Sequence, residues 1–378
     1  MEENVKRLSW RDLKDFKNQY EDTADGYYHY SKDLYNFPDA WCIIVWSPRG
    51  SGKTYSALWR HIYTNETIMY LKRTVEDVDT ICGGKAGVDM SPYIPINRDK
   101  LTNIVPVSIG KGLGGFYKSV DGEPDGLPVS YILALNKIKS VKGIEASRCS
   151  EIILDEFIPQ LGERVSQKEG KQLLSLYMTV LRDRVARGNS QPRLVLFANA
   201  EEISTPITNE LEIVDYMAEL NAIEDYNIMY LEDKGIVLHR LLAEESPIVE
   251  KQFHKLGIYR ALKDTAWGRT AFEGDFASND FTNVTSCNLK NMKILCCIKR
   301  NTHNYYVYVR HSDGFYYMTT SASDKCSLYY DTNLENDQKR FYNELYFTLR
   351  EACVEGRMKF KKYSMYDFLI NYKKFFKL

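Results

Sequence analysis

The chain has 378 residues and a formal net charge of −1 at pH 7, with 50 lysines and arginines against 51 aspartates and glutamates. This length allows two domains of ordinary size, and 44% hydrophobic with 27% charged residues is typical of a globular chain rather than a disordered one. A net charge near zero neither favours nor excludes binding to nucleic acid, so any basic surface must be confined to part of the molecule.

The cysteines and the apolar runs exclude several other classes. Eight cysteines are scattered without a C-x-x-C pair, which favours reduced thiols over a zinc site or a disulfide framework. The charged first residues predict no signal peptide, and no apolar run approaches membrane-spanning length. We therefore expect a cytoplasmic protein without a membrane partner.

The segment 1–40 predicts a helix at about 9–20 and then a stretch rich in tyrosine. Aromatic rings just ahead of a phosphate loop could stack on a base, but packing on the edge of the domain is the interpretation we favour. The tyrosines of this segment are Tyr27, Tyr28, Tyr30 and Tyr35.

The motif on which the reading of the whole chain depends lies at residues 41–55. An apolar strand is followed by a loop resembling G-x-x-x-x-G-K-[ST] and then by a helix. Gly50 and Gly52 allow backbone N–H groups to turn inward around a polyphosphate, Lys53 would reach the β and γ phosphates, and Thr54 would ligate Mg²⁺. The alternative is a glycine-rich turn before an ordinary helix. The residues predicted to bind ATP are Arg49, Gly50, Ser51, Gly52, Lys53 and Thr54.

One position departs from the motif, because Ser47 stands where its first glycine belongs. A glycine there relieves strain, whereas Lys53 and Thr54 carry the chemistry. We therefore expect the departure to affect only how tightly the loop closes.

The segment after the loop predicts a helix at 55–64, a strand at 68–71, a loop or hairpin insertion at 83–126 and a strand at 131–135. An apolar strand at 152–156 then ends in Asp155 and Glu156. An acidic pair at the end of a strand is commonly plain solvation. Following a phosphate loop, however, Asp155 predicts an Mg²⁺ ligand opposite Thr54, and Glu156 a general base for water.

A helical pattern at 172–185 ends in several arginines, among them Arg182, and a buried strand at 193–200 follows. Ligands of parallel sheets bind beyond the carboxyl ends of the strands, so we expect Asn199 near the γ-phosphate or the attacking water. The alternative is that Asn199 only caps the next turn. Strands that alternate with helices up to this point predict an α/β fold with a doubly wound, mainly parallel sheet.

Beyond residue 205 the character changes. Residues 206–235 are acidic and helical and predict a linker or lid, and three runs at 292–298, 305–309 and 315–319 predict an antiparallel meander. A helix at 334–354 follows. The last segment, 356–378, carries seven lysines or arginines among aromatic residues, which suits phosphate backbones or a solvated amphipathic helix.

Four short segments in this order resemble the DNA-encapsidation ATPases of small tailed phages, which are P-loop motors of the ASCE class. The segments are P-R-G-S-G-K-T at 48–54, I-I-L-D-E-F at 152–157, T-V-L-R-D-R at 179–184 and L-F-A-N-A at 196–200. The motifs match over about residues 35–205. In the rest of the chain only the order of the predicted strands and helices is similar.

The resemblance implies an ATPase domain at 1–205, the linker at 206–235, and at 236–378 a smaller α+β domain that is similar to a vestigial RNase H-like nuclease without a catalytic metal cluster. It also implies a homo-oligomeric ring, expected to be a pentamer, that uses ATP and Mg²⁺ to push double-stranded DNA through the portal into the prohead. By position, Arg182 and Lys142 match basic residues offered to a neighbour's nucleotide. Such a motor acts in the host cytoplasm, is bound to the prohead only transiently, and is absent from the mature virion.

Three questions stay open at this point. A packaging RNA is a partner of some members of the family, and the sequence does not decide whether it is one here. A helicase or recombination ATPase, or a large terminase with nuclease activity, would share the first motifs. A nucleotide switch is the third alternative, and Glu156 argues against it because a switch has no need of a general base.

Overall fold

The computed structural model describes residues 4–83, 90–140, 146–160, 162–163, 165–277, 279–322 and 326–376. The chain divides into two compact units. The first unit combines Met1–Leu211 with Glu219–Ser278, and the second combines Glu212–Ala218 with Asn279–Leu378. Within the described ranges, no helix is long and apolar enough to cross a membrane.

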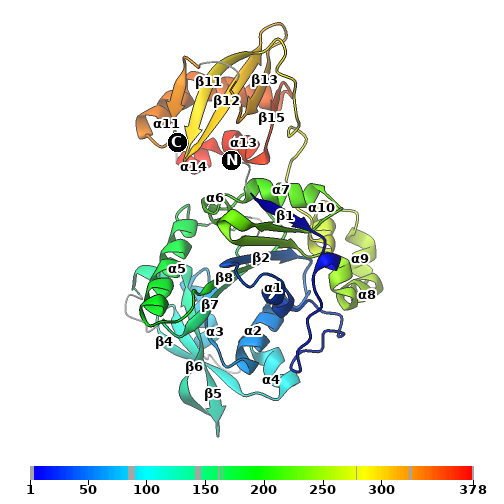
Figure 1. The fold of residues 1–378 in the computed structure, drawn as a ribbon, viewed down its shortest axis with the longest axis vertical. Coiled ribbons are helices and arrows are strands. Elements are labelled where there is room, and N and C mark those ends of the chain that lie inside the picture. The colour runs from blue at the N-terminus through cyan, green and yellow to red at the C-terminus, as the bar shows by residue number, and fades with distance from the viewer. Residues whose placement is uncertain are drawn as a thin grey trace. The chain divides into compact units, whose positions relative to one another are not determined.

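A ten-stranded sheet forms the centre of the first unit, in the order β1-β9-β10-β2-β8-β7-β3-β6-β5-β4 (Figure 1). The strands from β10 through β2, β8, β7 and β3 to β6 are parallel to their neighbours, and the remaining pairs are antiparallel. The strands are β1 (Val5–Leu8), β2 (Cys42–Ser47), β3 (Thr67–Lys72), β4 (Ile104–Gly110), β5 (Leu113–Val120), β6 (Glu123–Ala134), β7 (Cys149–Asp155), β8 (Arg193–Asn199), β9 (Ile228–Leu231) and β10 (Ile236–Arg240).

The central strands are apolar on both faces because helices cover both faces. One face packs against α1 (Tyr30–Asn36), α2 (Lys53–Tyr63), α3 (Val75–Cys82) and α4 (Ile94–Lys100), which share a buried cluster with alternate strand residues such as Ile43 and Val45. The intervening residues, such as Ile44 and Trp46, are equally buried. The helix α5 (Glu169–Ala186) packs beside α6 (Pro206–Glu210) and contacts β7. The predicted α/β fold is therefore confirmed for this unit.

The order β2-β8-β7 sets the positions of the motifs. An additional strand, β8, separates the strand of the phosphate loop from the acidic strand, and all three run in the same direction. Ser47 lies opposite Asn199, and Asp155 lies opposite Phe197. The ends of these strands therefore meet at one edge of the sheet, as we expected for a ligand site of a parallel sheet.

The helix predicted at 9–20 is wrong. The chain instead forms β1 and a short 3-10 turn, η1 (Trp10–Asp12). Strand β1 pairs with β9, and the Trp10 N–H donates to Asn227 Oδ1 at 2.8 Å. These partners lie near opposite ends of the sequence of this unit, so a local helical pattern could not reveal them. The insertion at 83–126 contains α4 and the β4–β5 hairpin, which agrees with the prediction.

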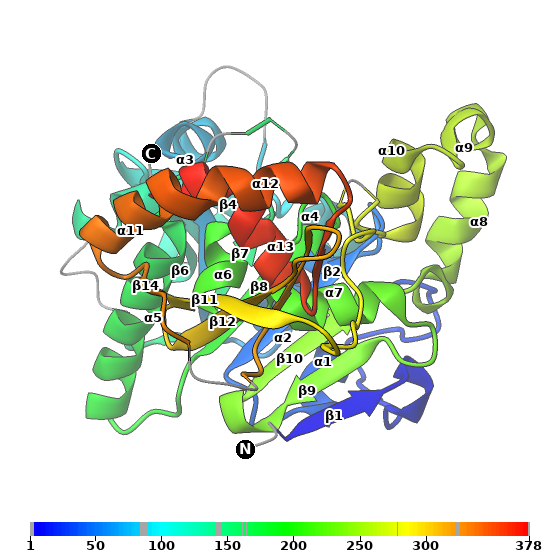
Figure 2. The same cartoon turned by 90° about the horizontal axis from the view of Figure 1, so that it is seen from above.

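The compact units differ from the predicted boundaries at 205 and 236. Strand β10 pairs in parallel with β2 and antiparallel with β9, which places residues of the expected linker (β9) and second domain (β10) in the central sheet. The helices α8 (Pro247–Lys255), α9 (Gly257–Leu262) and α10 (Ala266–Gly268) also belong to the first unit. Figure 2 shows them projecting together from one side of it.

A five-stranded sheet in the order β14-β11-β12-β13-β15 forms the second unit. Its strands are β11 (Lys293–Arg300), β12 (His303–Arg310), β13 (Phe315–Thr319), β14 (Tyr329–Asp331) and β15 (Met358–Phe360). Strands β11, β12 and β13 form the predicted antiparallel meander. The helix predicted at 334–354 is present as α11 (Glu335–Phe341), a π-helical turn (Tyr342–Tyr346) and α12 (Phe347–Val354).

The basic segment at 356–378 is integral to the core of the second unit. It forms β15, α13 (Tyr363–Ile370) and α14 (Tyr372–Phe376). Phe368, Leu369 and Tyr372 are fully buried, whereas the described lysines of α14 are exposed. The segment is therefore amphipathic and packed into the fold, and deleting it would remove core residues rather than a loose tail.

Candidate functional site

The phosphate loop between β2 and α2 has the backbone that its glycines predict. Gly50 and Gly52 have φ angles of 80° and 96°, and Gly52 caps the N-terminus of α2. A Cβ on Gly52 would lie 3.3 Å from Tyr27 Cβ and 3.4 Å from the Tyr28 carbonyl oxygen, so the position requires glycine on two grounds. The unpaired N–H groups of a helix start attract anions, which favours phosphate at this place.

Lys53 is buried at the base of this loop. Its Nζ donates to Ser47 Oγ and, at 3.4 Å, to Ser51 Oγ, and these two hydroxyls share a hydrogen bond of 2.7 Å. Burial lowers the pKa of Lys53 to about 8, and the nearby Asp155 carboxylate only partly opposes this shift. Ser47 is therefore accommodated without exposure to solvent, and its hydroxyl supplies an acceptor that a glycine would not.

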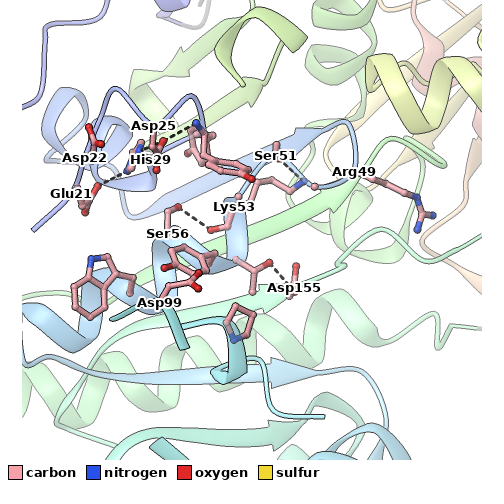
Figure 3. A pocket seen from close by; sticks show the side chains of 18 of the residues that line it. Glu21, Asp22, Asp25, His29, Arg49, Ser51, Lys53, Ser56, Asp99 and Asp155 are labelled. Atoms are coloured by element: carbon pink, nitrogen blue, oxygen red, sulfur yellow. Dashed lines mark hydrogen bonds and ion pairs between the residues drawn. The ribbon is translucent and has the colours of Figure 1, made fainter. Parts of the chain in front are cut away.

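Arg49 differs from the other predicted loop residues. Its backbone N–H donates to the Ala271 carbonyl oxygen at 3.1 Å, and its guanidinium pairs with Glu201 at 3.2 Å. Figure 3 shows the Arg49 side chain directed away from Lys53. A direct phosphate contact by the Arg49 guanidinium would therefore require release of its pair with Glu201.

Thr54 and Asp155 meet as the two motifs predict. The Thr54 hydroxyl donates to Asp155 Oδ2 at 3.0 Å, and the Tyr70 hydroxyl donates to the same oxygen at 3.1 Å. A hydroxyl and a carboxylate are oxygen ligands of the kind that Mg²⁺ prefers. The donor set therefore fits an Mg²⁺ ion held between α2 and β7, with Tyr70 orienting the carboxylate.

Glu156 adopts a backbone conformation that is uncommon for a residue with a side chain. Its φ angle is 58°, directly after the end of β7. The guanidinium of Arg73 donates to the carbonyl oxygens of Glu156 at 3.1 Å and of Phe157 at 2.9 Å. Arg73 is itself bound by Glu169 at 2.6 Å.

Arg73 and Tyr70 are site residues that the sequence does not single out. Both lie at the end of β3, which neighbours β7 in the sheet, and the only available signal was that β3 ends in polar residues at the same edge. Their role depends on contacts between segments that are far apart in the chain, which no local pattern reports.

A cavity of about 640 Å³ opens over the phosphate loop (Figure 3). Asp155, Glu156 and Asn199 line it together with the predicted loop residues. The structure thus brings together the predicted nucleotide, metal and base positions, and Asn199 lies on the strand between them.

Arg182 does not belong to this group. It lies on α5 with 76% of its side chain exposed, and it pairs only weakly with the adjacent Asp183 at 3.4 Å. Arg184, by contrast, is buried, and it donates to the carbonyl oxygens of Ser147 and Ser190. Lys142 lies outside the described residues.

Two solved structures share this fold over nearly the whole chain. A chain of the viral genome packaging motor assembly of bacteriophage Phi-29 aligns with a TM-score of 0.60 and 20% identity, covering 92% of this chain and 98% of that chain. A chain of the Phi-28 gp11 DNA packaging motor aligns with a TM-score of 0.54 and 14% identity, covering 93% and 98%. No family model and no curated protein matches the sequence. The predicted resemblance to phage packaging ATPases is confirmed at the level of the fold.

Proposed function

We propose that this protein is an ATP-driven translocase of double-stranded DNA, the motor that packages a phage genome through a portal into the prohead. The observation that carries the proposal is the convergence of Lys53, the Thr54–Asp155 pair and Glu156 on one cavity at the carboxyl edge of a parallel sheet. The shared fold of two phage packaging motors supports the same assignment.

Each residue has a distinct role in this proposal. Lys53 and the N–H groups of the loop bind the β and γ phosphates, and Thr54 and Asp155 hold Mg²⁺, which neutralises charge that develops on the phosphates. Glu156 accepts a proton from the attacking water, and Asn199 orients that water or senses the γ-phosphate. Tyr70 and Arg73 position the two carboxylates through the contacts described above.

The exposure of Arg182 supports action on a neighbouring subunit. The Arg182 guanidinium is 76% exposed and does not line its own cavity, so in a ring it could reach the next nucleotide. An arginine finger stabilises charge on the transferred phosphoryl group and is worth about 10³ to 10⁵ in rate. Lys142 is proposed for the same role on the ground of its motif alone.

The second unit is proposed to grip nucleic acid without cutting it. In the meander the only acid is Asp313, and its carboxylate is bound by Arg310 Nη2 at 2.8 Å in a turn. A two-metal nuclease needs several converging carboxylates, which the meander does not offer. Exposed lysines on α14 and the adjoining segments suit a phosphate backbone, and this binding should weaken as salt rises. An RNase H-like origin of this unit and a packaging RNA as its partner remain proposals.

ATP hydrolysis measured with and without duplex DNA tests the proposal, because a motor couples the two. Duplex DNA should stimulate hydrolysis in a salt-dependent manner, and linear duplex should remain double-stranded. Separation of the strands would favour a helicase, whereas metal-dependent cleavage by the same chain would favour a nuclease-bearing terminase.

A further inference from the structure

The cavity extends well beyond the residues that hold phosphate. Its volume of about 640 Å³ lies within the range of about 300 to 1,000 Å³ that encloses a whole small ligand. Past the first turn of α2 it is lined by Tyr27 and His29 on the N-terminal segment and by Tyr55, Trp59 and Asp99 on α2 and α4. None of these residues has a role in the proposed hydrolysis.

Charged groups line the cavity away from Lys53 and the helix start. They include the carboxylates of Asp22, Asp25 and Asp99 and, beside Asp99, the cations Arg98 and Lys100. The Glu21 carboxylate is 1% exposed and already bonded to His29 and Ser31. Figure 3 shows Glu21, Asp22 and His29 at the end remote from Arg49. Carboxylates repel phosphate oxygens but accept hydrogen bonds from the amino and hydroxyl groups of a nucleoside. The Asp99 carboxylate, whose side chain is 40% exposed, can therefore accept a hydrogen bond from a ribose hydroxyl.

The wall that carries Tyr27 is held rigidly against the loop. The Tyr27 N–H donates to Asp25 Oδ1 at 2.8 Å, and the Tyr28 N–H donates to the Ser51 carbonyl oxygen at 3.0 Å. The imidazole of His29 bridges Glu21 at 2.9 Å and Asp25 at 3.0 Å, and its side chain is 13% exposed. Tyr27 is itself 37% exposed, so its ring is fixed at its base and open to the cavity.

The opposite wall presents a carboxylate of defined orientation. Asp99 Oδ1 accepts from Arg98 Nε at 2.7 Å and Asp99 Oδ2 from Arg98 Nη2 at 3.4 Å, while the Asp99 side chain is 40% exposed. Tyr55 directly follows the proposed Mg²⁺ ligand Thr54, so this wall begins beside the proposed phosphate site.

We propose that this end of the cavity is a nucleoside subsite in which Tyr27 stacks on the purine base of the nucleotide and Asp99 accepts a hydrogen bond from its ribose. The inference rests on the proposed function, since it takes the loop end as the triphosphate site. It reverses our sequence-based expectation that the tyrosines ahead of the loop only pack on the edge of the domain: Tyr28 and Tyr30 do pack inside, but Tyr27 does not.

Comparison of ATP with inorganic tripolyphosphate tests the subsite, because tripolyphosphate occupies only the loop end. Equilibrium dialysis of the full chain with labelled ATP and Mg²⁺ on ice, with unlabelled tripolyphosphate or 2′-deoxyATP as competitor, gives the three affinities. Tyr27→Ala should weaken ATP by roughly 5- to 100-fold, the range for loss of base stacking, and change tripolyphosphate by less than about twofold. Tyr27→Phe should retain ATP affinity, and Tyr35→Ala, an exposed tyrosine of α1 outside the cavity, serves as the matched control.

Asp99→Asn should reduce the preference for ATP over 2′-deoxyATP and leave tripolyphosphate affinity unchanged or higher. Equal losses of ATP and tripolyphosphate in Tyr27→Ala would mean that the loop itself is distorted, and unchanged ATP affinity would mean that the ring does not stack; either result overturns the subsite. The nucleotide site itself would be wrong if the unaltered chain bound neither ATP nor tripolyphosphate, or if Lys53→Ala bound both as tightly as the unaltered chain does. The proposed function would then fail too.

Discussion

Lys53 is buried, and a charged ammonium group in a buried position is unfavourable unless an anion lies beside it. Burial lowers its pKa to about 8, so in the nucleotide-free protein its charge is lost above that pH, whereas the unfolded chain keeps the proton to about 10.5. Between these values the unfolded state binds more protons, so this residue makes the nucleotide-free fold more stable as pH rises. Nucleotide binding shows the opposite dependence, because phosphate requires the charged form.

The affinity for Mg²⁺·ATP should therefore be nearly constant from about pH 7 to 7.5 and weaken by up to about tenfold per unit above pH 8. Calorimetry at pH 8.5 in two buffers of different ionisation enthalpy should show proton uptake on binding. Lys53→Arg keeps its charge and should lose this dependence even if it binds more weakly. Affinity that stays flat to pH 9.5 would show that the charge of Lys53 does not control binding.

Glu156→Gln should bind Mg²⁺·ATP with normal affinity and fail to hydrolyse it. The substitution keeps the loop and the Thr54–Asp155 pair but removes the base, and loss of a general base commonly costs about 10² to 10⁴ in rate. Single-turnover hydrolysis and equilibrium binding measure the two effects separately. Glu76→Gln, on an exposed face of α3, is the matched control, and equal hydrolysis by both variants would remove Glu156 from the catalytic role.

At the scale of elements, Arg73 joins the end of β3 to the end of β7 and the start of α5. Arg73→Ala should lower the rate of hydrolysis by about 10- to 100-fold while ATP affinity stays within about twofold, because Glu156 would lose the contacts that fix its backbone. It should also destabilise the fold by about 3–5 kcal/mol, since Glu169 is 4% exposed and would be left unpaired.

A second variant separates these two effects. Arg73→Met combined with Glu169→Gln removes the unpaired charge, so urea unfolding should show recovered stability while single-turnover hydrolysis stays slow. Recovery of both together would mean that Arg73 acts only on stability and does not position Glu156.

The elements that could be predicted are those whose signal is local. Strands β2, β7 and β8 are continuous apolar runs because both of their faces are covered, and the turn residues Gly50 and Gly52 mark the phosphate loop between a strand and a helix. Strand β1 is a short strand at the sheet edge, and its partner β9 comes from a distant part of the sequence. The residues that follow Leu8 therefore resemble the start of a helix when they are taken alone.

The difference between local signals and distant contacts also explains which site residues can be found from the sequence. Thr54, Asp155 and Glu156 are recognisable because their chemistry follows from motif spacing. Arg73 and Asp99 are ordinary charged residues in sequence. Only the folded structure places Arg73 against the backbone of Glu156 and Asp99 in the wall of the cavity. The compact units differ from the expected boundaries for a related reason, because β10 pairs with β2 and the sequence of neither strand indicates that pairing.

At the scale of the whole molecule, the exposed position of Arg182 predicts that hydrolysis depends on subunit contacts. Arg182→Ala alone should be inactive, and so should Glu156→Gln. A mixture of the two variants should recover activity at those subunit boundaries where an intact Glu156 of one subunit meets an intact Arg182 of its neighbour. Arg187→Ala, also exposed near the end of α5, is the control. An absence of recovery at every mixing ratio would place Arg182 in its own subunit's structure or on an idle surface.

The central claim is that hydrolysis at this cavity moves duplex DNA into a capsid. The most direct test incubates purified proheads, linear duplex DNA and the full chain with Mg²⁺ and ATP, and measures DNA that becomes resistant to added nuclease. The unaltered chain should protect full-length duplex only when ATP is present, and Glu156→Gln should protect none under the same conditions. DNA-stimulated hydrolysis by a chain that protects no duplex on competent proheads would contradict the account, because ATP turnover would then serve some process other than packaging.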